Sequence, residues 1–257
     1  MNAHLVRRFC FLSMFLCVPA SDSSATPAHT PPSTPLKVTL KTTDGVSVFG
    51  LEYQALAPRA IILLFHQAGS NKGEYASIAP RLAHEGFTVL AIDQRSGGNL
   101  FGQENDTVKK LSKSSNYLET MPDLEAALAW GSPQKLPIVV WGSSYSASLV
   151  FLLTNKHTDK IAAVLAFSPG EYLGQDGVVQ KAAAKITQGV FVTSSSDSEE
   201  IAAAKKIIAA SPSKNKVHFI PKIAGVHGSS TLREDKNSKG QGENWQAVLA
   251  FLNSLKF

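Results

Sequence analysis

The feature that most constrains the fold is residues 136–151, LPIVVWGSSYSASLVF, where a strand pattern changes into a helix pattern within a few positions. The apolar run 138–141 includes β-branched residues and follows the breaking sequence GSP at 131–133, so we expect a buried strand that ends at Gly142. From about Tyr145 the apolar positions no longer alternate and suit a buried helix. A strand that runs directly into a helix is typical of α/β folds.

The turn between these two elements, residues 142–146, has the sequence GSSYS. Such a turn holds its central residue, Ser144, at a tight and strained corner with the hydroxyl pointing outward. The residues two before and two after the serine pass close to neighbouring backbone and must be small, as Gly142 and Ser146 are. The segment is therefore a G-x-S-x-S version of the G-x-S-x-G nucleophile motif, with an ordinary Gly-Ser-Ser turn as the alternative.

The rest of the chain alternates between apolar strands and helical stretches. An Asp-Gly turn predicts an antiparallel hairpin of the strands 36–42 and 46–53. Further strands are expected at 60–65, 87–92, 161–167, 189–193 and 217–220, and further helices at 72–84, 122–130, 199–210 and 243–255. Largely apolar strands that alternate with helices predict one α/β domain, over 36–257, with a mostly parallel sheet covered on both faces.

Polar residues lie where these strands end. In a parallel sheet the carboxyl ends of the strands meet at one edge, and ligands bind there. The polar clusters of this sequence fall at or shortly after such ends, at His66, Asp93, Ser144, Ser168, Asp197 and His227. We therefore expect the functional site at this edge of the sheet.

A serine hydroxyl becomes a good nucleophile when a base takes its proton and an acid holds that base. Among seven histidines, His227 lies in the glycine-flanked loop AGVHG, between the last strand and the last helix, and we assign it as the general base. For the acid we favour Asp197, with Glu199 and Glu171 as alternatives. An aspartate just before a helix is also typical of an N-cap, and that structural role for Asp197 stays open.

The negative oxygen of a tetrahedral intermediate requires two preorganised backbone N–H donors. One is expected from Tyr145, which follows the candidate nucleophile at the N-terminus of its helix, where the helix dipole favours negative charge. The other is expected from Ala68 or Gln67, in the loop after the strand at 60–65.

The N-terminal residues have the pattern of a secretory signal peptide, with a basic start, an apolar run at 9–18 and small residues after it. We predict a signal peptide over 1–20, with cleavage as late as Ala25, and a flexible Ser/Thr/Pro-rich tail over 21–35. The run is too short to span a bilayer, so the mature form is expected to have no membrane span and to be secreted or periplasmic. A buried N-terminal helix is the alternative.

The composition is ordinary for a globular protein. Hydrophobic residues make up 44% and charged residues 18% of 257 residues, which allows a sizeable core. Both cysteines, Cys10 and Cys17, lie in the expected signal peptide, so the mature chain would have no thiol or disulfide. The formal net charge is only +5, without interleaved basic and aromatic residues, so we expect no nucleic-acid partner. We also expect no metal and no cofactor, and the oligomeric state stays open.

These residues resemble the α/β-hydrolase superfamily, in its compact branch similar to dienelactone hydrolases. The likeness covers about residues 36–257 and is carried by the ordered set His66-Gln67-Ala68-Gly69-Ser70, Asp93-Gln94-Arg95, Gly142-Ser143-Ser144-Tyr145-Ser146, Asp197 and His227-Gly228. The resemblance implies an eight-stranded sheet and a triad in the order Ser, Asp, His. Three departures are present: Gln67 and Ser146 replace usual glycines, and dienelactone hydrolases themselves use a cysteine nucleophile.

The expected function is a serine carboxylesterase that cleaves small or accessible esters through an acyl-enzyme on Ser144. The segment 168–188 is too short for a large cap domain, which favours an open site. The aromatic residues Tyr145, Phe167 and Tyr172 are candidates for an apolar acyl pocket or for ordinary core. A serine peptidase or thioesterase and a catalytically idle, hydrolase-like binding protein are the alternatives.

Overall fold

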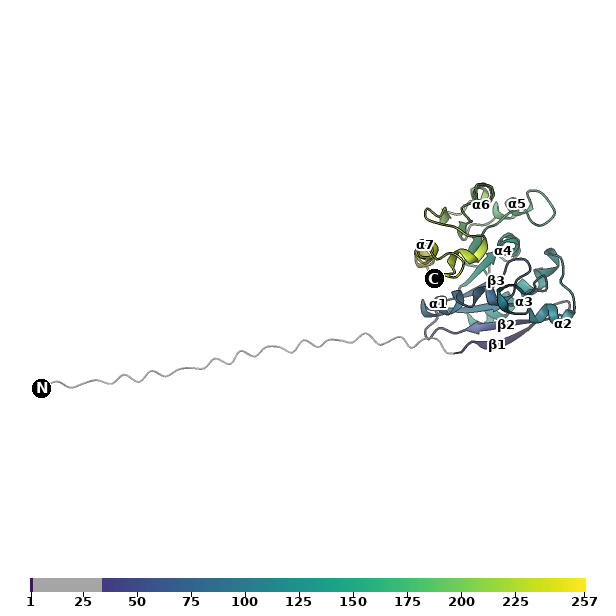
Figure 1. Ribbon diagram of the computed structural model, residues 1–257, viewed down its shortest axis with the longest axis horizontal. Helices are drawn as coiled ribbons and strands as arrows, with labels where there is room; N and C mark the ends of the chain where they lie inside the picture. Colours follow the sequence, from purple (N-terminus) through teal and green to yellow (C-terminus); the bar gives the residue numbers. More distant parts are fainter. Residues whose placement is uncertain (2–33) are drawn as a thin grey trace. The chain divides into compact units, whose positions relative to one another are not determined.

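The computed structural model describes residue 1 and residues 34–257. The expected signal peptide and nearly all of the expected tail lie outside the described residues. The described domain contains an eight-stranded sheet in the order β1-β2-β4-β3-β5-β6-β7-β8. Figure 1 shows the sheet with its helices and labels the first three strands. Its strands are β1 (Leu36–Lys41), β2 (Ser47–Tyr53), β3 (Ala60–Phe65), β4 (Phe87–Ile92), β5 (Ile138–Ser143), β6 (Ala163–Phe167), β7 (Gly189–Thr193) and β8 (Lys216–Phe219).

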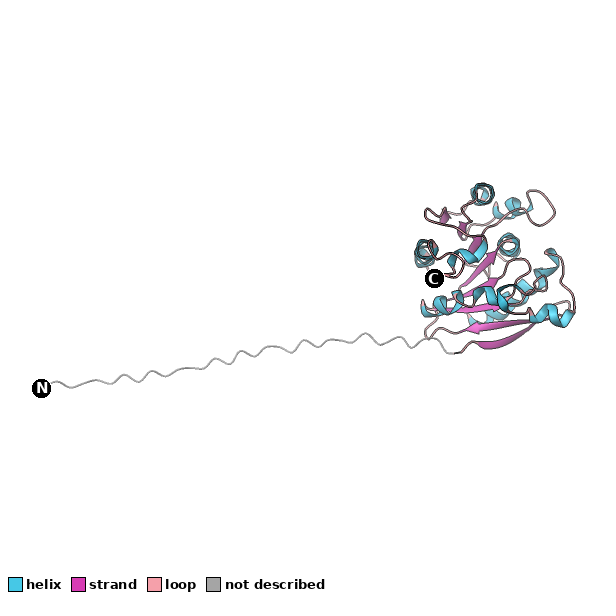
Figure 2. Cartoon of the chain, in the orientation of Figure 1, coloured by secondary structure: helices cyan, strands magenta, loops and turns pink. Residues whose placement is uncertain are grey.

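The sheet is mostly parallel, as the sequence predicted. Strand β2 pairs antiparallel with β1 and with β4, and all pairs from β4 across to β8 are parallel. The first hairpin turns at the expected Asp-Gly pair, where Gly45 has a φ of 84°. The helices are α1 (Ile78–His84), α2 (Asp106–Leu111), α3 (Met121–Gly131), α4 (Tyr145–Lys156), α5 (Val178–Ala183), α6 (Ser198–Ala210) and α7 (Gln241–Ser254) (Figure 2).

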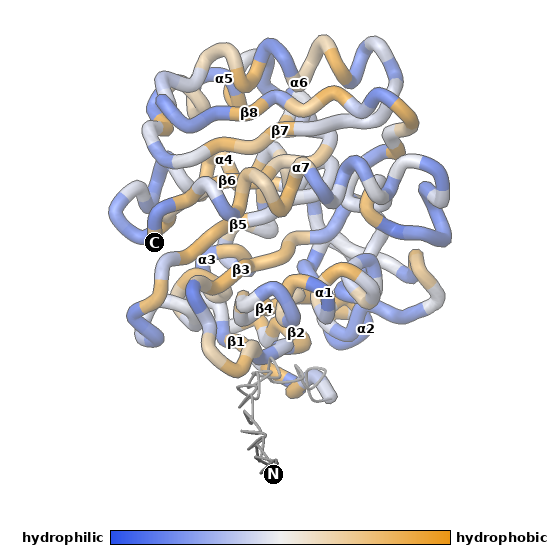
Figure 3. Tube along the Cα trace, turned by 90° about the vertical axis from the view of Figure 1, so that its left-hand side faces the viewer, coloured by the Kyte–Doolittle hydropathy of each residue, from blue (hydrophilic) through white to orange (hydrophobic). Residues whose placement is uncertain are grey.

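Helices cover both faces of the sheet, and this explains why the central strands are apolar at every position. Successive side chains of a strand point to opposite faces. In β3, Ile61, Leu63 and Phe65 pack in the core that contains residues of α3, α4, α5 and α6. The intervening residues of β3, including Ile62 and Leu64, pack in a second core with residues of α1 and α7. The strands β3 and β5 therefore appear mostly hydrophobic in Figure 3.

Two regions differ from the expected elements. The single helix expected at 72–84 is a 3₁₀ turn, η1 (Lys72–Tyr75), followed separately by α1, and Asn71 caps the turn by accepting a hydrogen bond from the amide of Gly73. The segments expected as loops contain α2 and α5, each only six residues long. Helices this short carry little periodic signal, and α2 depends on its N-cap, Asn105, which accepts from the amide of Val108.

The connections at the carboxyl edge of the parallel strands are the ones that bring the candidate residues together. Ser144 follows β5 directly, and the segment after β6 runs only to residue 177 before α5 begins.

In the described part of the chain, no helix is both long enough and apolar enough to cross a bilayer.

Candidate active site

The backbone at Ser144 has the strained geometry that the sequence predicted for this turn. Its φ of 58° and ψ of −125° lie where non-glycine residues are rare, at a cost of about 1–3 kcal/mol. The amide of Ser144 donates to the carbonyl of Phe167 at 2.8 Å, which ties the corner to the neighbouring strand β6. The side chain of Ser144 is partly exposed, whereas its neighbours Ser143 and Tyr145 are buried. The turn therefore presents one hydroxyl to the edge of the sheet.

Close approach of the backbone explains the small residues on both sides of Ser144. A Cβ at position 142 would overlap the backbone at Ser146 and Ala147. At position 146 a glycine is usual, but here the Ser146 hydroxyl donates to the carbonyl of His66 at 2.7 Å. It also accepts from the side-chain amide of Gln94 at 3.0 Å. Ser146 thus links the Ser144 turn to the loop after β3, a contact that glycine could not make.

Replacing Gly142 with alanine is expected to destabilise the protein by about 3 kcal/mol or more, because backbone cannot move aside as a flexible side chain can. The measurement is the urea unfolding midpoint. Gly242→Ala is the matched control, since a Cβ there meets no atom within 4 Å on helix α7. That substitution should be neutral or stabilising by up to about 1 kcal/mol. Equal midpoints for the two variants would contradict the close approach at Gly142.

His227 is paired with Glu200. The imidazole Nδ1 lies 2.8 Å from Glu200 Oε1, and the other carboxylate oxygen accepts from the amide of Ser195 at 3.1 Å. The Ser168 hydroxyl also hydrogen-bonds to this carboxylate. The same hydroxyl accepts from the amide of Gly228 at 2.9 Å, so the loop that carries His227 is fixed beside its acid.

Asp197, which we predicted as the acid, does not contact His227 in this structure. Its carboxylate accepts from the amides of Glu199 and Glu200 at 2.9 and 3.1 Å and caps the N-terminus of α6. This is the structural role that the sequence left open. The alternative Glu171 is held by the amides of Val179 and Gln180, at the start of α5. The geometry therefore gives the position beside the imidazole to Glu200.

Glu200, which we did not predict as the acid, has a local sequence pattern that could have indicated its position. Once Asp197 is the N-cap, Glu200 is the third residue of the helix, the position where a glutamate often folds back toward the preceding chain. Glu200 does fold back, and it reaches the amide of Ser195 and the imidazole of His227 together. The helix start, and not the strand end, thus supplies the carboxylate.

Charge pairing stabilises the ionised acid. Burial opposes ionisation of Glu200, but hydrogen bonds from His227, Ser168 and the Ser195 amide outweigh it and lower the pKa of Glu200 to about 2. In turn, the hydrogen bond to Glu200 raises the pKa of His227 above its ordinary value of 6.5, against the effect of partial burial. The carboxylate is therefore charged at neutral pH and holds the imidazole with Nδ1–H toward it.

A hydrogen bond from a backbone amide to a serine hydroxyl brings the His227 loop to the Ser144 turn. The amide of Ser229 donates to the Ser143 hydroxyl at 2.8 Å, so the residue before Ser144 contacts the loop just after His227. A Cβ at Gly228, whose φ is 65°, would overlap the same hydroxyl. The hydrogen bonds among the described residues do not include one from the Ser144 hydroxyl to the imidazole. Such bonds are often long in free enzymes and shorten when substrate binds.

The two amides expected to face a negative oxygen differ in their availability. Tyr145 is the first residue of α4, so its N–H has no acceptor within the helix. The amide of Gln67 donates to Glu74 Oε2 at 2.8 Å and is therefore occupied, which corrects the expectation for that residue. Ala68, the other candidate in this loop, is the donor that we retain.

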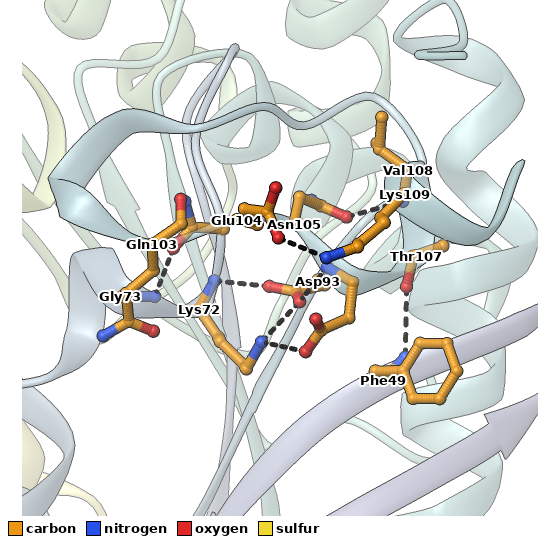
Figure 4. Close-up of polar contacts among 12 residues, drawn as sticks. Phe49, Lys72, Gly73, Asp93, Gln103, Glu104, Asn105, Thr107, Val108 and Lys109 are labelled. Atoms are coloured by element: carbon orange, nitrogen blue, oxygen red, sulfur yellow. Dashed lines mark hydrogen bonds and ion pairs between the residues drawn. The ribbon is translucent and has the colours of Figure 1, made fainter. Parts of the chain in front are cut away.

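The remaining polar residues at this edge support the loops. His66 is fully buried, and burial lowers its pKa to about 4, so its imidazole is neutral. Its Nδ1 donates to the Gln67 carbonyl, and its Nε2 accepts from the Gln94 amide. Asp93 is also buried and accepts from the Lys72 ammonium at 2.6 Å and from the amides of Lys72 and Asp106 (Figure 4). These groups hold η1 and α2 against the end of β4.

A surface cavity of about 390 Å³ lies between the segment that follows α2 and the loop after β6. It is lined by Ser115, Asn116, Tyr117, Leu118, Tyr172 and Leu173. Of the three aromatic residues expected in an acyl pocket, Tyr172 lines this cavity. Tyr145 and Phe167 are instead buried, and Phe167 stacks on Trp141 at 4.4 Å in the core. Tyr145, the residue after Ser144, stacks on Tyr117 in the wall of the cavity, and their ring centroids are 4.3 Å apart.

Within residues 34–257, no group of three or more His, Cys, Asp or Glu side chains is arranged to hold a metal ion.

A family model described as Hydrolase_4, serine aminopeptidase S33, matches residues 57–227. The chain belongs to this family. The match includes Ala68, Ser144, Glu200 and His227 and confirms the α/β-hydrolase superfamily that the sequence motifs indicated.

Individual relatives are distant. A Schizosaccharomyces pombe protein assigned as a monoglyceride lipase is 25% identical to this chain over 114 residues. These residues are 44% of this chain and 29% of the S. pombe protein. An esterase from Pyrococcus furiosus superposes with a TM-score of 0.64 at 20% identity, over 86% of this chain and 93% of the esterase. A dienelactone hydrolase from Anabaena variabilis gives 0.66 at 15% identity, over 88% of this chain and all (100%) of that enzyme. At these identities the two structures show the shared fold.

Proposed function

We propose that this protein is a serine carboxylesterase that forms an acyl-enzyme on Ser144. The observation that carries the proposal is the strained Ser144 turn, whose neighbour Ser143 is hydrogen-bonded to the loop of the His227–Glu200 pair. A serine fixed at a backbone cost of about 1–3 kcal/mol is typical of a residue that must be presented to a substrate. In this proposal Glu200 takes the role that the sequence assigned to Asp197.

The proposed reaction begins when the Ser144 hydroxyl attacks the ester carbonyl while His227 Nε2 takes its proton. Glu200 holds the imidazole by Nδ1–H and stabilises the imidazolium that forms. The amides of Tyr145 and Ala68 bind the negative oxygen of the tetrahedral intermediate. His227 then gives the proton to the leaving alcohol, and water hydrolyses the acyl-enzyme by the same steps.

The cavity beside Tyr145 favours an ester with an apolar acyl group. Tyr117, Leu118 and Tyr172 are each more than one-third exposed and present apolar surface, and Tyr117 stacks on Tyr145, the residue after Ser144. The names of the relatives, an esterase and a monoglyceride lipase, support carboxylic esters as the substrate class. We further propose, from the N-terminal sequence pattern, that the protein acts outside the cytoplasm, in the periplasm or as a secreted enzyme.

The test is turnover of p-nitrophenyl acetate, butyrate and octanoate, compared with an aminoacyl p-nitroanilide, by the purified mature chain. We expect ester hydrolysis to exceed amide hydrolysis, and a fluorophosphonate to add one covalent adduct that peptide mass spectrometry places on Ser144. Faster amide hydrolysis would identify a peptidase instead. Absence of both turnover and adduct would identify a binding protein on a hydrolase fold.

The pH dependence of turnover follows from the His227–Glu200 pair. The base acts when its imidazole is neutral, so kcat/KM should rise with pH through the pKa of His227. Because Glu200 raises that pKa, the midpoint of the rise is expected above 6.5. The control is His157→Gln, since His157 also contacts a glutamate, Glu125, at 3.1 Å but lies at the far end of α4. A midpoint that moves with His157 would contradict the assignment.

A further inference from the structure

Glu74 is a fully buried carboxylic acid that the proposed reaction does not use. It belongs to the 3₁₀ turn η1, and burial raises its pKa although hydrogen bonds from Ser143, Gln67 and Ser70 oppose this effect. A buried carboxylic acid is costly unless its oxygens are hydrogen-bonded. An apolar residue would pack at this depth without that cost, so the contacts of Glu74 require an explanation.

Each oxygen of Glu74 holds a different loop of the site. Oε2 accepts from the amide of Gln67 at 2.8 Å, in the loop after β3. Oε1 accepts from the hydroxyl of Ser143 at 2.6 Å, at the end of β5 where the Ser144 turn begins. The Ser143 oxygen in turn accepts from the amide of Ser229 at 2.8 Å, in the loop that follows His227. One side chain therefore joins three loops that are separated by tens of residues in the sequence.

Each of these contacts is next to a group of the proposed reaction. Gln67 precedes Ala68, Ser143 precedes Ser144, and Ser229 lies two residues after His227. The turn that carries Glu74 is itself fixed, because the guanidinium of Arg233 donates to the carbonyls of Gly73 and Glu74 at 3.1 and 2.8 Å. A shift of Glu74 would move the oxyanion donor, the nucleophile and the base relative to one another.

We propose that Glu74 is a positioning residue, which sets the mutual geometry of the oxyanion loop, the nucleophile turn and the His227 loop. This inference rests on the proposed function for its kinetic consequence, but the coupling of the loops is measurable without turnover. Misplacement of reacting groups by about 1 Å is enough to lower a rate by about 100-fold. Glu74 is therefore expected to affect kcat more than KM, since it contacts no part of the cavity at Tyr117 and Tyr172.

The first test compares Glu74→Ala with Glu74→Gln. Alanine removes all contacts and should lower kcat about 10- to 100-fold with KM changed by less than about threefold. Glutamine keeps an acceptor for the Gln67 amide and a polar contact to Ser143, so it should recover most of kcat. Asp123→Ala is the control, because Asp123 is equally buried and bonded to Arg95 but touches none of the three loops. A similar loss of kcat in Asp123→Ala, or none in Glu74→Ala, would overturn the proposal.

The second test is amide hydrogen exchange followed by mass spectrometry, which does not depend on activity. Glu74→Ala should raise exchange together in peptides covering 66–70, 142–146 and 226–230, whereas Asp123→Ala should not. Ser143→Ala, which keeps the Gln67 contact, should raise exchange at 226–230 without raising it at 66–70. Unchanged exchange in all three peptides of Glu74→Ala would overturn the proposal. A wild type without esterase activity but with this exchange pattern would refute the proposed function alone.

Discussion

Replacing Ser144 with alanine is expected to lower kcat/KM for p-nitrophenyl butyrate by about 10³-fold or more and to abolish the fluorophosphonate adduct. The reason is that the acyl group would have no oxygen to which it could transfer. The neighbouring hydroxyls cannot substitute, because Ser143 is bonded to Glu74 and Ser146 is bonded to the carbonyl of His66. Initial-rate kinetics on the folded variant measure this loss.

Ser148→Ala is the matched control for this experiment. Ser148 is a buried serine of the same helix, α4, and its hydroxyl bonds the carbonyl of Gly170 instead of facing the site. Its kcat/KM should stay within about threefold of the wild type. His227→Ala should be as damaging as Ser144→Ala, and the double variant no worse than either, because the two groups act as one unit. Full activity in Ser144→Ala would refute the nucleophile assignment.

The fold was predictable because its determinants are local. A strand that is apolar at every position, such as 60–65, is buried on both faces, and the structure places its alternate residues in two separate cores. The strained turn at Ser144 was also predictable, since Gly142 and Ser144 lie two residues apart and the steric demand acts between close neighbours in the chain. Short segments such as α2 were missed because six residues carry almost no periodicity.

The polar network was not predictable in the same way. Glu74 and Ser143 are in contact although they are 69 positions apart in the sequence, and no sequence pattern at either position predicts this hydrogen bond. The occupied amide of Gln67 follows from that network, so it could not be deduced from the loop sequence alone. Glu200 was not among the alternatives that we weighed for Asp197, which were Glu199 and Glu171, and the reason is different. Asp197 and Glu200 both lie at the start of one helix, and the side chain that folds back toward the loop is decided by which residue caps the helix.

Glu200→Gln is expected to lower kcat by about 10⁴-fold, because an amide in this position selects the wrong tautomer of the histidine. One carboxylate oxygen of Glu200 must accept from the Ser195 amide, and the other faces His227 Nδ1. A glutamine has only one oxygen. If that oxygen bonds Ser195, the NH₂ group faces Nδ1, which must then be the acceptor, and the proton of the neutral ring moves to Nε2. That nitrogen could no longer take the proton of Ser144. Steady-state kinetics measure the loss.

Asp197 provides the comparison that decides between the two acids. Asp197→Asn should keep both kcat and stability, because asparagine is an equally good N-cap. Asp197→Ala should cost about 1 kcal/mol of unfolding free energy through the lost cap, with kcat within about threefold of the wild type. The opposite pattern, in which Asp197→Asn loses kcat and Glu200→Gln keeps it, would restore the assignment made from the sequence. The measurements therefore distinguish the two acids, because substitution of Glu200 should lower kcat, whereas substitution of Asp197 by alanine should lower the stability of α6.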